Sequence, residues 1–129
     1  MNYFLIIIAA FIALFFLMQI WIVRKTKSSK GKELNNIGGE IEKAIAKHQS
    51  LILYFFTPTC AACRTQTPIV EELKKSFPNI FSFDLSKDLS IGRQLGVMAT
   101  PTTLVIENKV IKEVFLGAQR KEKILSYLR

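Results

Sequence analysis

Residues 51–68 read LILYFFTPTCAACRTQTP and join an unbroken apolar run to two closely spaced cysteines. The first six residues are aliphatic or aromatic, and a run of this length is too short for a buried helix. Such a run is typical of a strand that is covered on both faces, as central strands of α/β sheets are. The sequence therefore predicts a pair of thiols directly after a central strand.

The two cysteines, Cys60 and Cys63, fall at the start of a helix expected over 60–76. On a first helical turn two such thiols are close enough to form a disulfide, and the helix dipole and free N–H groups favour a thiolate. Cys60, nearer the helix start, is the predicted nucleophile, and Cys63 is predicted to resolve the mixed disulfide. Arg64 adds positive charge beside them.

Two other interpretations of this pair are a metal site and thiols without chemistry. A closed zinc site requires four ligands, and the only histidine is His48, at the end of a predicted helix. Thiols without a chemical role have no reason to fall where a strand turns into a helix. We therefore expect redox chemistry at Cys60 and Cys63, with no metal and no organic cofactor.

Hydrophobic periodicity on either side of the pair predicts an α/β domain with the element order αβαβαββα. Asn36 is a candidate cap for the first helix, and Asn108-Lys109 would connect the last two strands as a hairpin. Strands that alternate with helices indicate a mostly parallel sheet with an antiparallel edge. The expected helices are 39–48, 60–76, 89–95 and 121–128, and the expected strands are 51–56, 80–85, 102–107 and 110–116.

Further residues recur at informative spacings around the cysteines. Pro68 follows Cys63 by five residues, Thr100-Pro101 precedes the third strand, and Gly117 precedes the last helix. Together with the buried strand and the CxxC motif, this pattern resembles the thioredoxin family over residues 37–129. The resemblance implies a thioredoxin fold, with a central mixed sheet of four to five strands flanked by helices.

The resemblance also implies how substrates bind. Pro101 would be cis, would lie beside the cysteines and would keep metal away from them. The backbone of Thr100 would pair with an extended substrate segment, and Gly117 would let the substrate backbone approach. Thr59 would border the same groove, at a position where many thioredoxins have tryptophan. The implied partners are proteins that carry disulfides or thiols and a reductase that supplies electrons.

Two departures from the family pattern bear on activity. Ala61 and Ala62 replace the usual Gly-Pro pair between the cysteines, and this dipeptide tunes the reduction potential. Tyr54 stands where thioredoxins bury an acid that relays protons to the second cysteine, and we interpret it as a core aromatic. Deprotonation of Cys63 must then use water or another group, which predicts slower turnover or a narrower substrate range.

The chain before this domain begins with a long apolar stretch. Residues 3–23 contain Gln19 as their only strongly polar side chain and would rise about 31 Å as a helix, the thickness of one hydrocarbon core. Tyr3 and Trp21 lie at the two ends, where amphipathic rings favour the headgroup level. A basic n-region and a small-residue cleavage site are missing, which favours an uncleaved anchor (1–23) over a signal peptide or a buried core helix.

The net charge of +8 is unevenly distributed. Five basic residues between Arg24 and Lys32 precede the first acid, while the rest of the chain has an ordinary balance of +3, so nucleic-acid binding is not expected. Residues 24–36 are predicted to form a solvated basic linker that also attracts anionic lipid headgroups. The positive-inside rule then places the domain, 37–129, in the cytoplasm.

The sequence as a whole predicts a single-pass protein, most simply of a bacterial plasma membrane, that reduces disulfides near the membrane through Cys60 and Cys63. Reduction is favoured because the domain has the size of a thioredoxin. It has no room for the helical insertion that periplasmic disulfide oxidases carry. Two alternatives remain. One is a periplasmic or extracellular orientation, in cytochrome c maturation or disulfide repair. The other is a tethered binding module whose thiols are inert.

Overall fold

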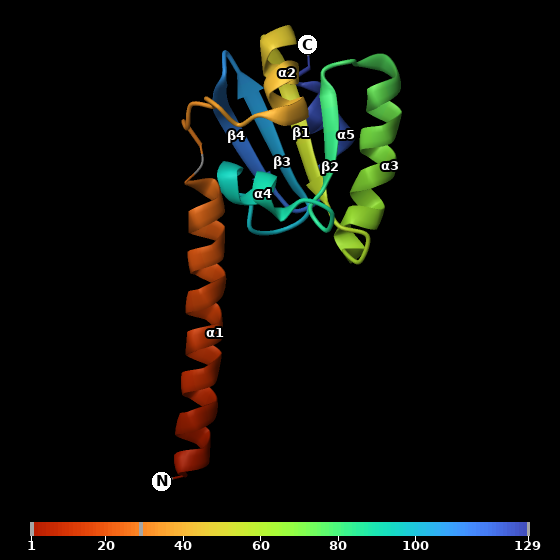
Figure 1. Cartoon of the computed structure of the whole chain (residues 1–129). Helices are drawn as coiled ribbons and strands as arrows, with labels where there is room; N and C mark the ends of the chain where they lie inside the picture. The colour runs from red at the N-terminus through yellow and green to blue at the C-terminus, as the bar shows by residue number, and fades with distance from the viewer. Residues whose placement is uncertain (1, 29, 129) are drawn as a thin grey trace.

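A long helix leads into an α/β domain (Figure 1). The structure is a computed structural model that describes residues 2–28 and 30–128. The helix, α1, spans Tyr3–Lys27, and its large apolar side chains are exposed along its length. It is long and apolar enough to cross a membrane, a test that a signal sequence near the N-terminus would also pass. Met1, Ser29 and Arg129, which fall within the ranges predicted above, lie outside the described residues.

The four strands form one mixed sheet in the order β2-β1-β3-β4. β1 pairs with β2 in parallel and with β3 antiparallel, and β3 and β4 are also antiparallel. The mixed sheet is confirmed, whereas the expectation of a mostly parallel sheet is wrong. The strands are β1 Ser50–Phe56, β2 Ile80–Asp84, β3 Thr102–Glu107 and β4 Val110–Leu116.

The connection between β2 and β3 explains why the sheet is mixed. Its only helix, α4 (Leu89–Leu95), has seven residues and rises about 10 Å, too little to return the chain to the far end of the sheet. β3 therefore enters at the edge where β1 and β2 end, and Thr102 pairs with Phe55 near the end of β1. We call this edge, with its connecting loops 57–60, 85–88 and 96–101, the active-site edge.

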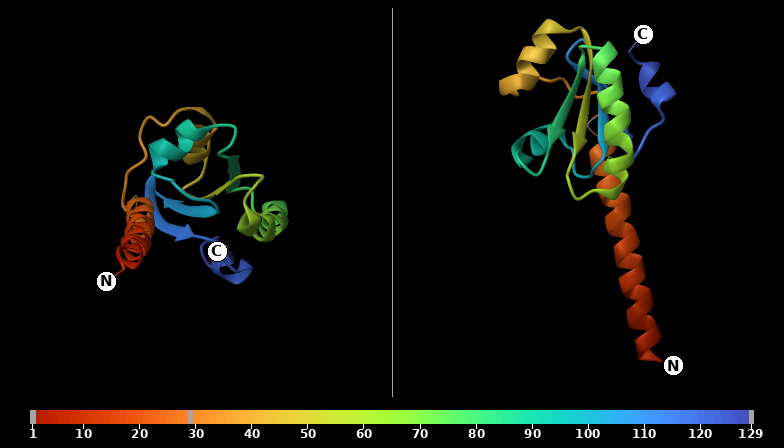
Figure 2. Two further views of the ribbon diagram at one scale, coloured as in Figure 1. Left: turned by 90° about the horizontal axis from the view of Figure 1, so that it is seen from below. Right: turned by 90° about the vertical axis from the view of Figure 1, so that its right-hand side faces the viewer.

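Helices cover both faces of the sheet (Figure 2). α2 (Gly39–Lys47) and α4 pack on one face, and α3 (Ala61–Ser76) and α5 (Lys121–Leu125) pack on the other. Successive β1 residues enter the two cores alternately, and residues 51–55 are all buried. The prediction of a central strand covered on both faces is confirmed.

The cap of one helix and the end of another differ from the sequence expectations. α2 begins at Gly39, as predicted, but its N-cap is Gly38 rather than Asn36, which lies two residues earlier and has a positive φ (57°). The Gly38 N–H donates instead to the Glu42 carboxylate (3.0 Å). α5 ends at Leu125, although Tyr127 and Leu128 still pack against the core.

The segment predicted to be a solvated linker, 24–36, has a different structure in both halves. α1 continues through Arg24 and Lys25 to Lys27. Residues 30–34, which we call the edge segment, run along β4, and their backbone hydrogen bonds to Lys109 and Ile111 measure 2.7–3.0 Å. Leu34 is 4% exposed and lies in the core. The physical reason is that the outer edge of β4 has unpaired N–H and C=O groups, which the edge segment satisfies.

Candidate active site

The cysteines occupy the turn between β1 and α3. The Cys60 N–H donates to the Thr57 carbonyl (3.3 Å), which closes the turn after β1. Cys60 has extended backbone angles and is the N-cap of α3, and its Sγ accepts a hydrogen bond from the Cys63 N–H (3.1 Å). The helix therefore begins at the cysteine that the sequence analysis placed at its start, and one of its free N–H groups points at the Cys60 sulfur.

Cys60 and Cys63 form a disulfide across this first turn. Their Cα atoms are 5.2 Å apart, within the range that disulfides require, as their spacing predicted. Cys63 is 2% exposed, whereas Cys60 is half-buried. Of the two cysteines, Cys60 is therefore the more accessible from outside the fold.

A second segment reaches the same turn through Thr100. The Thr100–Pro101 peptide bond is cis, as the resemblance implied. The Thr100 hydroxyl lies 3.4 Å from the hydroxyl of Thr57, whose carbonyl holds Cys60. The loop that carries the cis-proline is thus joined to the cysteine turn, and Pro101 itself is buried.

Gly117 is joined to the proline from the other side. Its N–H donates to the Pro101 carbonyl (2.9 Å), and its φ of +78° is a conformation that favours glycine. A Cβ at this position would meet no atom within 4 Å, so the space beside Gly117 is open. The structure therefore brings Thr100, Pro101 and Gly117 together at the active-site edge.

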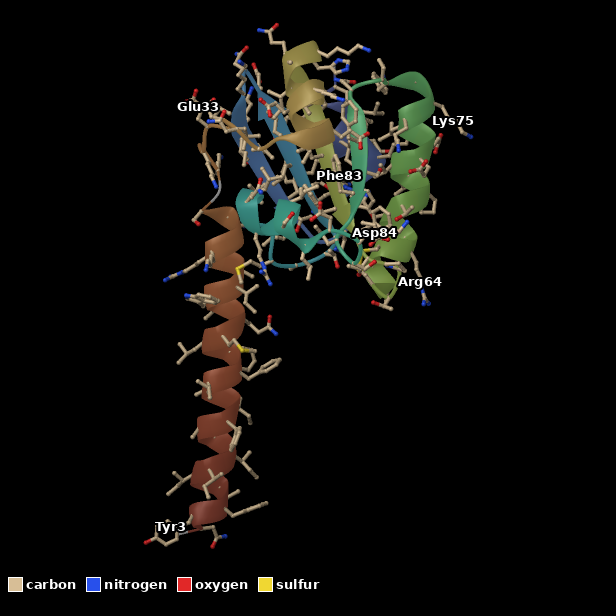
Figure 3. All side chains as sticks on the ribbon, viewed as in Figure 1. Tyr3, Glu33, Arg64, Lys75, Phe83 and Asp84 are labelled. Carbon is tan, nitrogen blue, oxygen red and sulfur yellow. A yellow bond between two sulfur atoms is a disulfide. The ribbon has the colours of Figure 1, made fainter. Side chains whose placement is uncertain are left out.

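The remaining predicted site residues on the turn and on the first turns of α3 are exposed. Thr59, Ala61, Ala62 and Arg64 all present their side chains to the surface. Arg64 lies near the start of α3 and extends away from the sheet (Figure 3). These residues flank Cys60 along the chain, and their effect on substrate choice and on reduction potential stays a prediction.

Tyr54 lies beneath the first turns of α3. It is 0% exposed, stacks on Phe56 and shares a hydrogen bond between its hydroxyl and that of Thr67 (2.9 Å). The same hydroxyl is 3.5 Å from the Cys63 carbonyl. Burial raises the pKa of Tyr54, while the bond to Thr67 lowers it to a smaller extent. At neutral pH this side chain is therefore an uncharged phenol that anchors the helix.

Sequence reasoning did not identify Gln66, which links the two halves of the site. It is 0% exposed, and its Oε1 accepts a hydrogen bond from the Gln119 N–H. The Gln119 side chain in turn donates to the Leu116 (3.1 Å) and Gly117 (3.2 Å) carbonyls. The missed signal was helical spacing, because Gln66 shares the buried face of α3 with Cys63.

Two buried polar atoms near this link have no hydrogen-bond partner in the part of the chain that the structure describes. They are Nε2 of Gln66 and Oγ1 of Thr103, and Thr103 pairs with Tyr54 across the sheet. Among residues 2–28 and 30–128, no three or more histidine, cysteine, aspartate or glutamate side chains gather as a metal site would require. The dithiol is therefore the chemical group on which we base the function.

Comparisons with known proteins agree with this geometry. The family model for thioredoxin matches residues 34–129. Thioredoxin 2 of Plasmodium berghei is 35% identical over 68 residues, which cover 50% of this chain and 43% of the relative. The thioredoxin of Rickettsia bellii is 21% identical over 90 residues, or 67% of this chain and 86% of the relative. The chain thus spans less than half the length of some relatives and most of the length of others.

Solved structures extend the likeness to three dimensions. A thioredoxin from Fasciola hepatica is 26% identical, with a TM-score of 0.60, and the match covers 68% of this chain and 88% of that one. A mutant thioredoxin from Halobacterium salinarum is 19% identical with a TM-score of 0.64 over 71% of this chain and 87% of its own, a likeness of fold alone. The expected fold is confirmed. The family model matches most of the chain, and the paired cysteines and the cis-proline agree with it, so the chain belongs to the thioredoxin family.

Proposed function

We propose that this protein is a membrane-tethered thiol–disulfide oxidoreductase that reduces disulfides of protein substrates close to the membrane. The observation that carries the proposal is the asymmetric exposure of the Cys60–Cys63 disulfide. One sulfur is accessible at the helix start, and the other is buried one turn inward. Attack from outside and resolution from inside require this arrangement.

In the reduced protein the helix start stabilises the thiolate of Cys60, which attacks one sulfur of a substrate disulfide. A Cys60–substrate bond forms, and the other substrate sulfur leaves as a thiolate and takes up a proton. The thiolate of Cys63 then attacks the Cys60 sulfur. The Cys60–Cys63 bond forms and the second substrate thiol leaves, so two electrons pass from the protein to its substrate.

Substrate binding is proposed for the groove that Thr59, Thr100, Pro101 and Gly117 border. Thr100 lies beside Thr57 of the cysteine turn, where an extended substrate segment would pair with its backbone. The open space at Gly117 accepts a closely approaching backbone. The exchange itself uses the two thiols without an organic cofactor, and a separate reductase would return the disulfide to its dithiol form.

The tether is proposed from α1. α1 has 25 residues, of which 3–23 are apolar apart from Gln19, and its exposed large apolar side chains are suited to lipid. The basic residues at its end favour a cytoplasmic domain. A bacterial plasma membrane is the proposed location.

Alkaline washing of membranes tests the tether. We expect the full-length chain in the pellet with residues 1–23 intact by mass spectrometry, and a soluble, shortened chain would contradict it.

The exchange reaction is tested with Cys63→Ser in the full-length chain. This variant should accumulate covalent adducts through Cys60 because the second attack is removed, and the adducts should release substrate proteins on reduction. Cys60→Ser is the matched control. Its remaining thiol, that of Cys63, is buried, so this variant should trap little substrate protein. Equal trapping by the two variants, or none by either, would contradict the proposal and favour a binding module with inert thiols.

A further inference from the structure

The register of the edge segment fixes the direction in which α1 leaves the domain. The segment runs antiparallel to β4, with Glu33 beside Val110 at the start of that strand. Nearer to α1, Lys30 forms an ion pair with Glu113 (2.7 Å), in the middle of β4. Followed backwards from Glu33, the chain therefore moves along β4 toward Leu116, the end of the strand.

That end of β4 belongs to the active-site edge. Leu116 pairs with Thr102, which in turn pairs with Phe55 near the end of β1, and the next residue, Gly117, bonds to Pro101. α1 consequently runs past the active-site edge on its way to the N-terminus, and Figure 1 and the right-hand view of Figure 2 show it extending from that side of the domain. If α1 spans a bilayer while it leaves the domain in this direction, the active-site edge, with Cys60 and Cys63, faces the lipid.

Several contacts hold this orientation. The Lys32 ammonium donates to the Gln94 carbonyl at the end of α4 (2.6 Å), and Leu34 is buried in the core. The end of α1 contacts β4, and Ile22 is half-buried where its neighbours are exposed. The domain is thus attached to the helix through a paired backbone and a buried side chain rather than through a slack tether.

The active-site edge also carries apolar side chains that the domain does not cover. Among the described residues outside α1, the large hydrophobic side chains that are exposed are Leu89 (60%) and Met98 (45%). Both line one hollow of the surface, together with Thr57 and Thr100 of the cysteine site. Exposed apolar side chains that gather on one side of a molecule mark a contact surface.

The charges on this edge suit a lipid surface. Arg64, Lys87 and Arg93 are exposed there. The carboxylates on the same edge, Asp84 and Asp88, already accept hydrogen bonds from Ser86 and Ser90. Basic side chains beside exposed apolar ones are the combination that binds the headgroup layer of a membrane with anionic lipids.

We propose that the active-site edge rests on the surface of the bilayer that α1 crosses, with Leu89 and Met98 at the level of the lipid headgroups. The proposal rests on the membrane tether proposed above. Cys60 then acts at the membrane surface, so its substrates are disulfides held within or directly above the headgroup layer. Disulfides that a substrate holds far from the bilayer would be out of reach.

Depth-dependent fluorescence quenching tests this orientation without using the redox reaction. In a Trp21→Phe background, Leu89→Trp places a single tryptophan on the active-site edge of the full-length protein in vesicles with anionic lipids. Brominated acyl chains should lower its emission by about half, because a side chain at the headgroup boundary lies close to the bromine atoms. Lys47→Trp, at the opposite end of the sheet, is the matched control and should be unaffected.

Met98→Trp is a second probe on the same edge in case Leu89→Trp disturbs α4, and it should be quenched to a similar extent. Emission at both edge probes that is independent of bromination, or equal quenching at Lys47→Trp, would overturn the proposal and indicate a domain held away from the bilayer or covered by a partner protein. Protein that does not float with the vesicles would overturn the tether as well. Loss of adduct formation by Cys63→Ser would contradict the exchange reaction alone.

Discussion

Among single residues, Tyr54 most clearly separates this chain from the family pattern. A phenol on a central strand fills the position below the active-site helix where the resemblance places the buried acid of thioredoxins, and it bonds to Thr67 rather than to either cysteine sulfur. Because burial raises the pKa of Tyr54, the phenol stays protonated at neutral pH and cannot act as the base for Cys63. In the proposed exchange, water or another group would take that role.

Tyr54→Phe should destabilise the full-length protein by about 1 kcal/mol near neutral pH, because the hydroxyl of half-buried Thr67 loses its partner. The difference in unfolding free energy between the two proteins should shrink at alkaline pH. Below pH 10.0 the phenol is neutral in the folded and in the unfolded chain. Above pH 10.0 the phenol of the unfolded chain ionises first, so the stability of the unsubstituted protein falls as the pH rises through the raised pKa of folded Tyr54. Phenylalanine lacks this titration. Urea unfolding of both proteins at pH 8 and pH 11 measures the difference, and a gap that widens with pH would contradict this assignment.

Short spacing in the sequence identified the dithiol at the start of α3, whereas the cis-proline and the place of Gly117 were expected only from the resemblance to thioredoxins. Gln66 and Thr103 were not identified as site residues. The burial of Gln66 follows from the packing of α3 on the sheet, and that of Thr103 from the central position of β3 within it. A polar side chain on a helical apolar face has no chemical signature of its own. The bond from Gln66 to the Gln119 backbone joins residues 53 positions apart, beyond any local pattern.

At the scale of elements, periodicity predicted each helix and strand of the domain, with the largest error at α5. The hairpin between β3 and β4 also forms as expected, and Asn108 and Lys109 take the positive φ values (52° and 65°) that such turns need without a glycine. The strand directions were predicted less well. They depend on the edge at which the chain re-enters the sheet after α4, and the short helix alone did not reveal that.

The connection after β4 provides the test at this scale. Gly117→Ala should cost about 1–2 kcal/mol in unfolding free energy, because alanine is strained at a φ of +78° even though its Cβ has space. If substrate backbone occupies that space, KM for a peptide disulfide should rise more than kcat falls. Ala118→Ser, exposed beside it, is the control and should change stability by less than about 0.5 kcal/mol. Unchanged stability and KM in Gly117→Ala would contradict the role given to this turn.

At the scale of the whole molecule, the main difference from the sequence expectation is the start of the domain. Residues 24–36 lack apolar periodicity, and their charges favoured a solvated linker. The signal that was missed is Leu34, an apolar residue in a polar stretch. Its burial depends on the pairing of the edge segment with β4. The first residue of that strand, Val110, lies 76 residues further along the chain than Leu34. The edge segment therefore belongs to the domain and links its orientation to that of α1.

Leu34→Ala should reduce the unfolding free energy of the domain by about 2–4 kcal/mol, because it leaves a cavity in the core. Asn35→Ala, the exposed neighbour, should have a much smaller effect. Chemical denaturation of the full-length variants, followed by circular dichroism of the α/β domain, measures both. Equal stabilities of the two variants would mean that the edge segment is a dispensable linker after all.

The central claim is that the Cys60–Cys63 pair exchanges two electrons with disulfides in other proteins, and thiol counting during a single turnover tests it most directly. Reduced full-length protein is mixed with a peptide that contains one disulfide, the reaction is stopped with an alkylating reagent, and both molecules are weighed. One Cys60–Cys63 bond should form for each peptide disulfide that is lost, and Cys60→Ser should slow the loss to the uncatalysed rate. A peptide disulfide that persists while both cysteines remain reduced, or a loss as fast with Cys60→Ser, would contradict the claim.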